Sequence, residues 1–241
     1  MRSETRHQLK EDRFSTATIH AAEATAHWSV EHKSTLTYGA VIVVVAAAIL
    51  GGSWYYFNQQ DLKASMSLSQ AVRTLNTPVR PANMPPQPDQ PSFASSKERA
   101  TEAHKQFQAI VDSYPHTRSA EFARYFLGLT SVDMGDNSAA EKDLNAVASS
   151  HNSDLSALAR FALASIYRNT NRNNDAINIY KDLIAKPTGT VGKTMAEVEL
   201  ASTYQAANQP LEAKRIYEQV QKDNPNSQIA QLAASKLQEL K

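Results

Sequence analysis

Four short cassettes recur between residues 103 and 220 of this chain at nearly constant spacing. Each has an alanine, a large apolar residue four positions later and an aliphatic residue three positions after that. The alanines are separated by 37, 36 and 37 residues. A fixed period in the thirties predicts stacked helical hairpins, because each hairpin can bury its apolar face only against its neighbours. The cassettes are Ala103, Phe107 and Ile110; Ala140, Leu144 and Val147; Ala176, Tyr180 and Leu183; and Ala213, Tyr217 and Val220.

Helical patterns continue from Ser95 onward, and no strand pattern interrupts them. Glycine, asparagine and proline punctuate these segments where helices should end. We therefore predict an all-α fold with a helical repeat domain at 95–241, including a terminal capping helix. The expected helices are 95–113, 118–134, 138–149, 154–169, 173–185, 193–207, 210–222 and 227–240.

A single apolar run precedes the repeats. Residues 36–57 carry no charge, and a helix of that length spans roughly 33 Å, enough for a hydrocarbon core of about 30 Å. Trp54, Tyr55 and Tyr56 follow the run as an interfacial aromatic belt would. We predict a retained transmembrane helix. The alternatives are a buried core helix, or a signal peptide cleaved near 51–53, although about 35 polar residues precede the run where a signal peptide has a short charged region.

The flanking regions suggest an orientation. Residues 1–35 have mixed charge and no apolar core, so we expect a cytoplasmic tail that is largely disordered or weakly helical. The cations beside the run do not decide the matter, since Lys33 precedes it and Lys63 and Arg73 follow it. Residues 58–76 should hold the first helix after the membrane. Six prolines then mark 77–94 as a linker or insertion.

The composition excludes several kinds of chemistry. A net charge of +1 provides no field for nucleic acid. The chain has no cysteine, which excludes disulfides, thiolate nucleophiles, cysteine–zinc sites and a lipidated N-terminal cysteine. None of the seven histidines forms the zinc-protease pair with glutamate, and a metal site at His27 and His32 is a remote alternative. No catalytic serine elbow or phosphate-binding glycine loop is present. We expect no enzyme activity, no metal and no cofactor.

The cassettes resemble the second helix of the tetratricopeptide repeat, which carries Ala-x3-Phe-x2-Ala and a proline shortly after it. Pro115 and Pro225 follow the first and last cassettes at the expected distance. The first-helix Leu-Gly position is filled by Leu127-Gly128, Leu163-Ala164 and Leu200-Ala201, whereas the usual tryptophan is replaced by Arg124, Arg160 and Glu197.

That resemblance implies a concave groove lined by the first helices, and protein ligands. No lysine–asparagine clamp for a peptide carboxylate is found at these places, so the groove suits a partner's helix or an extended apolar segment. The alternative is that the same residues pack against the neighbouring repeat. The predicted groove residues are Phe122, Tyr125, Leu129, Leu158, Phe161, Ser165, Met195, Val198 and Ser202, with Gln205 as a further polar point.

The layout of tail, single span, a helix from Asp61 and then repeats resembles the ancillary subunit of the bacterial Sec translocon. It implies a single-pass inner-membrane protein whose periplasmic repeat domain holds emerging unfolded chains or recruits a periplasmic chaperone. The stretch from Phe107 through Tyr114-Pro115 to Ala120 resembles a second group, the envelope repeat proteins of outer-membrane assembly and cell division. An envelope scaffold is therefore the alternative function.

Overall fold

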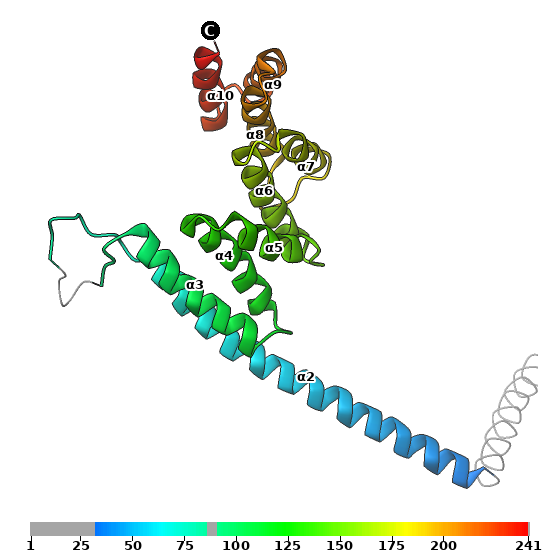
Figure 1. The fold of residues 1–241 in the computed structure, drawn as a ribbon. Helices are drawn as coiled ribbons and strands as arrows, with labels where there is room; N and C mark the ends of the chain where they lie inside the picture. Colours follow the sequence, from blue (N-terminus) through cyan, green and yellow to red (C-terminus); the bar gives the residue numbers. More distant parts are fainter. Residues whose placement is uncertain (1–31, 86–90, 241) are drawn as a thin grey trace, which may run out of the picture. The chain divides into compact units, whose positions relative to one another are not determined.

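The computed structural model describes residues 32–85 and 91–240 (Figure 1). Within these ranges the chain forms nine helices, and the only strand-like pairing is an isolated bridge between Val79 and Phe93. The predicted all-α fold is confirmed. The predicted tail falls mainly on residues 1–31, which lie outside the described residues, as do 86–90 of the proline-rich segment.

The chain divides into two units, residues 1–58 and 59–241, and the first helix in the description contributes to both. This helix, α2, runs without a break over Lys33–Leu75. The sequence predicted two elements here, 36–57 and 58–76. They are one helix because Asn58, Gln59 and Gln60 include neither glycine nor proline to stop it.

The apolar part of α2 has the properties of a membrane span by length and composition. An 18-residue window reaches a mean hydropathy of 2.0, and none of that window is buried against protein. Water would make such exposure costly, at about 25 cal/mol for each Å² of apolar surface.

The repeat domain consists of helices whose ends agree closely with the predicted ones. The largest difference is one residue, because the ends are set by local signals such as the capping hydroxyl of Thr117, which accepts from the Ala120 N–H. The helices are α3 Ser96–Ser113, α4 Arg118–Met134, α5 Asn137–Ala148, α6 Ser153–Asn169, α7 Asn173–Ala185, α8 Lys193–Ala206, α9 Pro210–Asp223 and α10 Gln228–Glu239.

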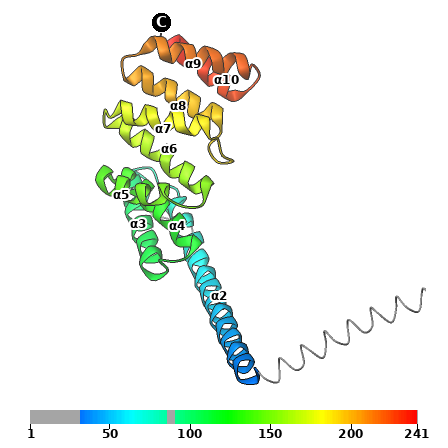
Figure 2. The same cartoon turned by 90° about the vertical axis from the view of Figure 1, so that its right-hand side faces the viewer.

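Consecutive helices pair into hairpins, and the hairpins stack (Figure 2). Every helix from α3 to α9 contacts the next one along the chain. The even-numbered helices also contact each other directly, α4 with α6, α6 with α8 and α8 with α10, whereas no such contact joins the described odd-numbered helices. The even-numbered helices therefore form the inner side of a curved stack.

The C-terminal half of α2 completes the first hairpin with α3. Ala64 and Ala71 are fully buried beside Phe107 of the first cassette. The Asp61 carboxylate accepts hydrogen bonds from the backbone N–H and the hydroxyl of Ser119 at the start of α4, at 3.1 and 3.0 Å. A carboxylate at a helix N-terminus is favourable because it faces the positive end of the helix dipole. The stretch 61–75 thus belongs to the stack.

Three of the hairpins turn in the same way. Gly135, Asn171 and Asn208 have positive φ angles of 87°, 60° and 57°, and they are 36 and 37 residues apart. Glycine and asparagine tolerate the left-handed region better than other residues. In each turn the backbone N–H of the residue after the left-handed one donates to a carbonyl in the last turn of the preceding helix, as in a Schellman motif. These bonds run from Asp136 to Ser131, from Arg172 to Tyr167 and from Gln209 to Tyr204.

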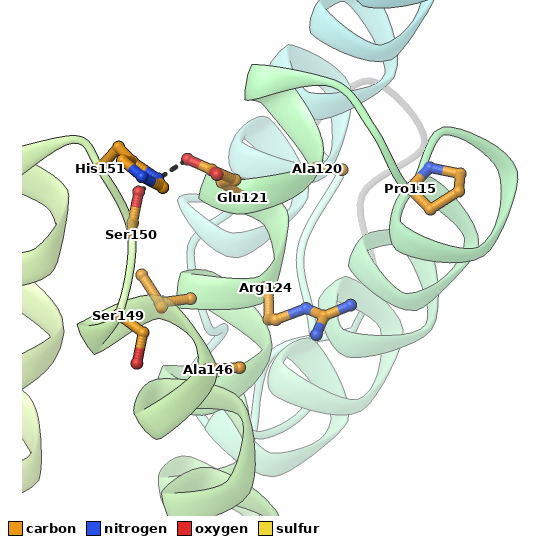
Figure 3. Close-up of a pocket in the computed structure, with 9 residues that line it drawn as sticks. Pro115, Ala120, Glu121, Arg124, Ala146, Ser149, Ser150 and His151 are labelled. Carbon is orange, nitrogen blue, oxygen red and sulfur yellow. Dashed lines mark hydrogen bonds between the residues drawn. The ribbon is translucent and has the colours of Figure 1, made fainter.

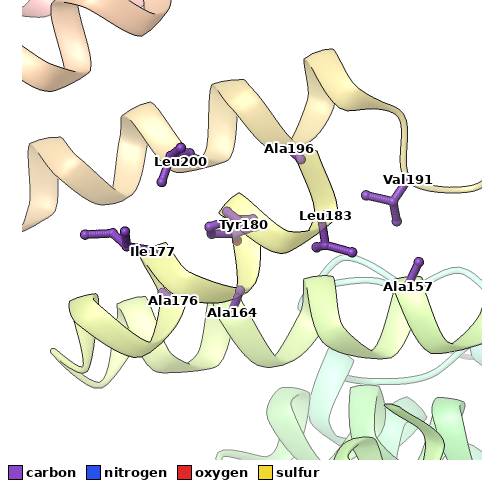
Figure 4. Close-up of a cluster of buried hydrophobic side chains, with 9 residues drawn as sticks. All are labelled: Ala157, Ala164, Ala176, Ile177, Tyr180, Leu183, Val191, Ala196 and Leu200. Atoms are coloured by element: carbon purple, nitrogen blue, oxygen red, sulfur yellow. The ribbon is translucent and has the colours of Figure 1, made fainter. Parts of the chain in front are cut away.

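The cassettes form the cores of the hairpins. Figure 4 shows the α6–α7–α8 cluster, where the Tyr180 ring lies among small and aliphatic side chains such as Ala164 and Leu200. In the preceding hairpin the corresponding place is tighter. A Cβ atom added to Gly128 would come within 2.5 Å of the buried Leu144 Cγ, so this glycine allows the close approach of α4 and α5.

Candidate protein-binding surface

A row of apolar side chains that are exposed or half-buried follows the even-numbered helices, one on each helix from α4 to α10. Phe122 is 37% exposed, Met195 43% and Leu232 45%, and Leu158 is half-buried. Successive members are 36, 37 and 37 residues apart, so they occupy the same position in successive hairpins. We call these four residues the apolar row.

Three of the predicted groove residues, Tyr125, Phe161 and Val198, pack mainly against neighbouring helices. Tyr125 packs against the α5–α6 core, and burial raises the pKa of its phenol. The Phe161 ring meets the Tyr180 ring edge-on, with 5.5 Å between centroids. Val198 is only 4% exposed and belongs to the last core cluster. These three side chains hold neighbouring helices together, and Val198 offers no surface to a partner.

The remaining predicted groove residues are half-buried. Leu129 and Ser165 lie on the inner helices α4 and α6. The Ser202 hydroxyl lies 2.9 Å from the Tyr217 hydroxyl and shares a hydrogen bond with it. Gln205 is also half-buried, one turn further along α8. These four residues are therefore only partly accessible to a partner.

Ion pairs join one hairpin to the next. Arg168 of α6 pairs with Glu199 of α8. Arg172, in the turn between α6 and α7, pairs with Glu141 of α5, and its guanidinium carbon lies 4.2 Å above the centre of the Tyr167 ring. Because each pair links adjacent hairpins, these charges help to fix the curvature that exposes the apolar row.

A polar pocket of about 260 Å³ lies between the start of α4 and the end of α5 (Figure 3). Arg124 and His151 line it, and the Ser150 hydroxyl donates to the Glu121 carboxylate at 2.9 Å. This bond ties the loop before α6 to α4. Among the described residues no group of three or more histidines, aspartates or glutamates is placed to hold a metal ion.

The geometry thus consists of stacked hairpins with an apolar inner row, and comparison with known families agrees with it. The profile of the tetratricopeptide repeat-like domain matches residues 26–181, more than half of the chain. The chain belongs to this family. The tetratricopeptide repeat profile also matches residues 196–227, which include α9 and most of α8. A comparison with curated proteins found no match, and neither did a comparison with solved structures.

Membership of the tetratricopeptide repeat-like family makes protein binding the general function of the repeat domain. The apolar row includes one residue outside the predicted groove set, Leu232 of α10. Leu232 is not among the predicted groove residues, because these were assigned only to the helices expected at 118–134, 154–169 and 193–207. The signal was present, since Leu232 follows Met195 by the repeat length of 37 residues.

Proposed function

We propose that this protein is a membrane-anchored adaptor of the export channel, and that its apolar row holds segments of newly translocated polypeptide. The observation that carries the proposal is the row itself, four apolar side chains at one position in successive hairpins. A folded partner usually presents a shaped surface, whereas a translocating chain presents isolated apolar side chains. A periodic row with few polar groups suits the latter.

The charge pattern along the inner side supports an unfolded ligand. None of the nine predicted groove residues is charged, and neither is Leu232, although 20% of the chain is Asp, Glu, Lys or Arg. The row therefore imposes no charge requirement on its ligand. A short extended segment of varied sequence meets that condition as long as it carries apolar side chains.

The proposed anchor is the uncharged part of α2, residues 36–57. Its function would be to confine the repeat domain to the membrane plane, which raises its effective concentration near other membrane proteins without any new contact. In this proposal residues 1–35 are cytoplasmic and the repeat domain is periplasmic, in a bacterial inner membrane. A periplasmic chaperone recruited to the channel is a further partner under the same proposal.

Site-specific photo-crosslinking in intact cells tests the proposal directly. A photoreactive residue at Phe122 or Met195 should form adducts with channel subunits and with secretory proteins during export. Leu211 is the matched control, because it is apolar and 82% exposed but lies on α9, outside the inner row. Adducts confined to outer-membrane-assembly or division proteins would favour the envelope scaffold instead. Equal labelling from all three positions would refute the assignment of the surface.

A binding measurement complements the crosslinking. The full-length protein in detergent, with Phe122, Met195 and Leu232 all changed to serine, should bind a reduced, unfolded polypeptide at least tenfold more weakly than the natural protein. Leu211→Ser should leave the affinity unchanged. Helical content must stay constant, which circular dichroism reports, since all four positions are partly exposed.

A further inference from the structure

A second pocket lies between α7, α8 and α9, among side chains that the sequence analysis did not assign to a site. Its volume is about 400 Å³, which lies within the usual range for ligand pockets of about 300–1,000 Å³. The apolar part of its lining is Ile184 from α7, Leu200 from α8 and Ile216 from α9. We call it the α7–α9 pocket.

The corresponding place one hairpin earlier is arranged differently. Arg160 of α6 is the counterpart of Glu197 of α8, 37 residues before it. Arg160 reaches across to α7, where its Nη2 lies 2.7 Å from Asp182 Oδ2. Glu197 instead pairs along its own helix with Lys193, at 3.5 Å. The counterpart of Asp182 is Gln219, which lines the α7–α9 pocket. Thus no ion pair of this kind crosses the second site.

The charged residues around the pocket balance each other. Lys181 and Arg215 contribute two positive charges, and Glu197 and Glu212 contribute two negative ones. A charged side chain that contacts the apolar lining of the pocket would lose its hydration, and the pocket has no net opposite charge to compensate that cost. An uncharged side chain avoids this cost. Among uncharged side chains an aromatic ring gains more, because it buries a large area and its face attracts nearby cations.

The chain itself shows this kind of contact. The Lys181 ammonium group already lies 5.9 Å from the centre of the Tyr204 ring. Arg215 is on α9 at another side of the same pocket. An aromatic ring that enters the pocket and contacts Leu200 would lie between two cationic side chains, Lys181 of α7 and Arg215 of α9.

We propose that the α7–α9 pocket binds an uncharged aromatic side chain, tryptophan above all, presented by a protein partner. The site differs from the apolar row. Met195 and Glu197 are two residues apart on α8, which separates them by roughly 200° around the helix. A partner held at the pocket would leave the apolar row free, so a folded protein and an extended chain can be bound at the same time.

The test uses the full-length protein in detergent and an uncharged, capped peptide Gly-Gly-Trp-Gly-Gly, titrated by calorimetry. Matched peptides carry Ser, Lys or Glu in place of the tryptophan. The tryptophan peptide should bind in a one-to-one complex at least tenfold more tightly than each of the others. Blank titrations into detergent alone subtract partition of the peptide into micelles.

Variants locate the binding. Glu197→Trp puts an indole ring of the chain's own into the pocket and should weaken the peptide at least tenfold, whereas Glu197→Ala removes the Lys193 pair without filling the space and should retain binding. Glu218→Ala is the surface control, since Glu218 pairs with Lys214 elsewhere on α9. A combined Phe122→Ser and Met195→Ser variant should bind the peptide normally.

Two outcomes overturn the proposal. One is equal affinity for the tryptophan, serine and charged peptides. The other is undiminished tryptophan binding in Glu197→Trp when circular dichroism shows the variant folded. If Glu197→Trp fails to fold, Ile216→Ala removes part of the lining at a half-buried position and should weaken the peptide by at least threefold, and an unchanged affinity there contradicts the site as well.

Discussion

The hairpins α6/α7 and α8/α9 share a backbone design and a cassette, yet they treat their buried tyrosines differently. Tyr180 and Tyr217 are both 0% exposed. The Tyr217 hydroxyl shares a hydrogen bond with Ser202, whereas the Tyr180 hydroxyl has no hydrogen-bond partner among the described residues. Ser165 occupies the position that corresponds to Ser202, but the structure gives it no bond to Tyr180.

The difference shows that a repeated backbone does not enforce repeated side-chain contacts. The cassette requires a large, flat ring between two helices, and both tyrosines meet that requirement. The cassette does not specify a partner for the tyrosine hydroxyl. It also does not specify the residue at the repeating position that holds Arg160 in one hairpin and Glu197 in the next. In the α6/α7 hairpin the residue at this position, Arg160, forms an ion pair with Asp182. In the α8/α9 hairpin the residue at this position, Glu197, lines a pocket.

The largest expected effect comes from removing either ring. Tyr180→Ala and Tyr217→Ala should each destabilise the repeat domain by about 3–5 kcal/mol, because a fully buried ring is lost and a cavity remains. Urea titration of the full-length protein in detergent, followed by circular dichroism, measures this. A loss below about 1 kcal/mol at one site would show that the two rings do not have the same structural role.

Alkaline pH should produce the next largest effect. Burial raises the pKa of Tyr180, Tyr217 and Tyr125 above the ordinary value. Above pH about 10 the unfolded chain loses phenolic protons that the folded chain keeps, so folding stability falls as pH rises. Each tyrosine contributes a slope of up to about 1.4 kcal/mol per pH unit.

The comparison is sharpened by Tyr180→Phe, which should flatten this alkaline loss more than Tyr217→Phe does, because the Ser202 hydrogen bond opposes the rise in the Tyr217 pKa. Urea titrations at several pH values between 8 and 11.5 provide the measurement. Below pH 9 the curves of the natural protein and of both variants should run parallel, since the phenols are protonated in both states. A pH-independent difference throughout would contradict this account.

The same substitutions at neutral pH should separate the two hairpins by opposite signs. Tyr217→Phe should destabilise the protein by about 0.5–1.5 kcal/mol, since it removes a hydrogen bond and leaves Ser202 unpaired. Tyr180→Phe removes a buried hydroxyl without a partner, so it should be neutral or stabilising by up to about 1 kcal/mol. Thermal or urea unfolding distinguishes the outcomes, and similar losses at both sites would mean that Tyr180 has a partner in solution.

The smallest effect on folding stability is expected at the Arg160–Asp182 ion pair, which is found in the α6/α7 hairpin and has no counterpart among the described residues of the α8/α9 hairpin. Arg160 and Asp182 are 31% and 68% exposed, so Arg160→Ala should cost about 0.2–1 kcal/mol, and less at high salt. A double-mutant cycle with Asp182→Ala isolates the pair. A coupling energy above about 2 kcal/mol would show that the bridge is a structural determinant of the hairpin.

Much of the fold could be predicted because its signals are local. Caps, prolines and left-handed turn residues end the helices near where the sequence places them, as at Thr117 and Asn171. The period of the alanines is enough to predict stacking. The continuity of α2 was not predicted. The sequence changes from apolar to polar near Asn58, which suggested two elements, but no residue there breaks the helix.

The binding surface was harder to predict. The resemblance to the tetratricopeptide repeat implies groove positions at Phe122, Leu158 and Met195 and equally at Tyr125, Phe161 and Val198, because all six fall on the groove side of the first helices in that pattern. Which of two apolar positions faces solvent depends on how each hairpin rotates against the next, and this angle is set by contacts between repeats. The α7–α9 pocket had a weak signal, the change from Arg160 to Glu197 at one repeating position.

The contacts between even-numbered helices, each with the next even-numbered helix and no further, determine how the molecule yields to force. Tension applied at the C-terminal end passes through every hairpin in series, but the outermost hairpin has a neighbour on one side only. It should therefore detach first, and the array should come apart in successive steps instead of one rupture. Each step frees about 37 residues, or on the order of 120 Å of extended chain. If the repeat domain holds a translocating chain as proposed, loss of the outermost hairpin would leave the inner hairpins and their part of the apolar row in place.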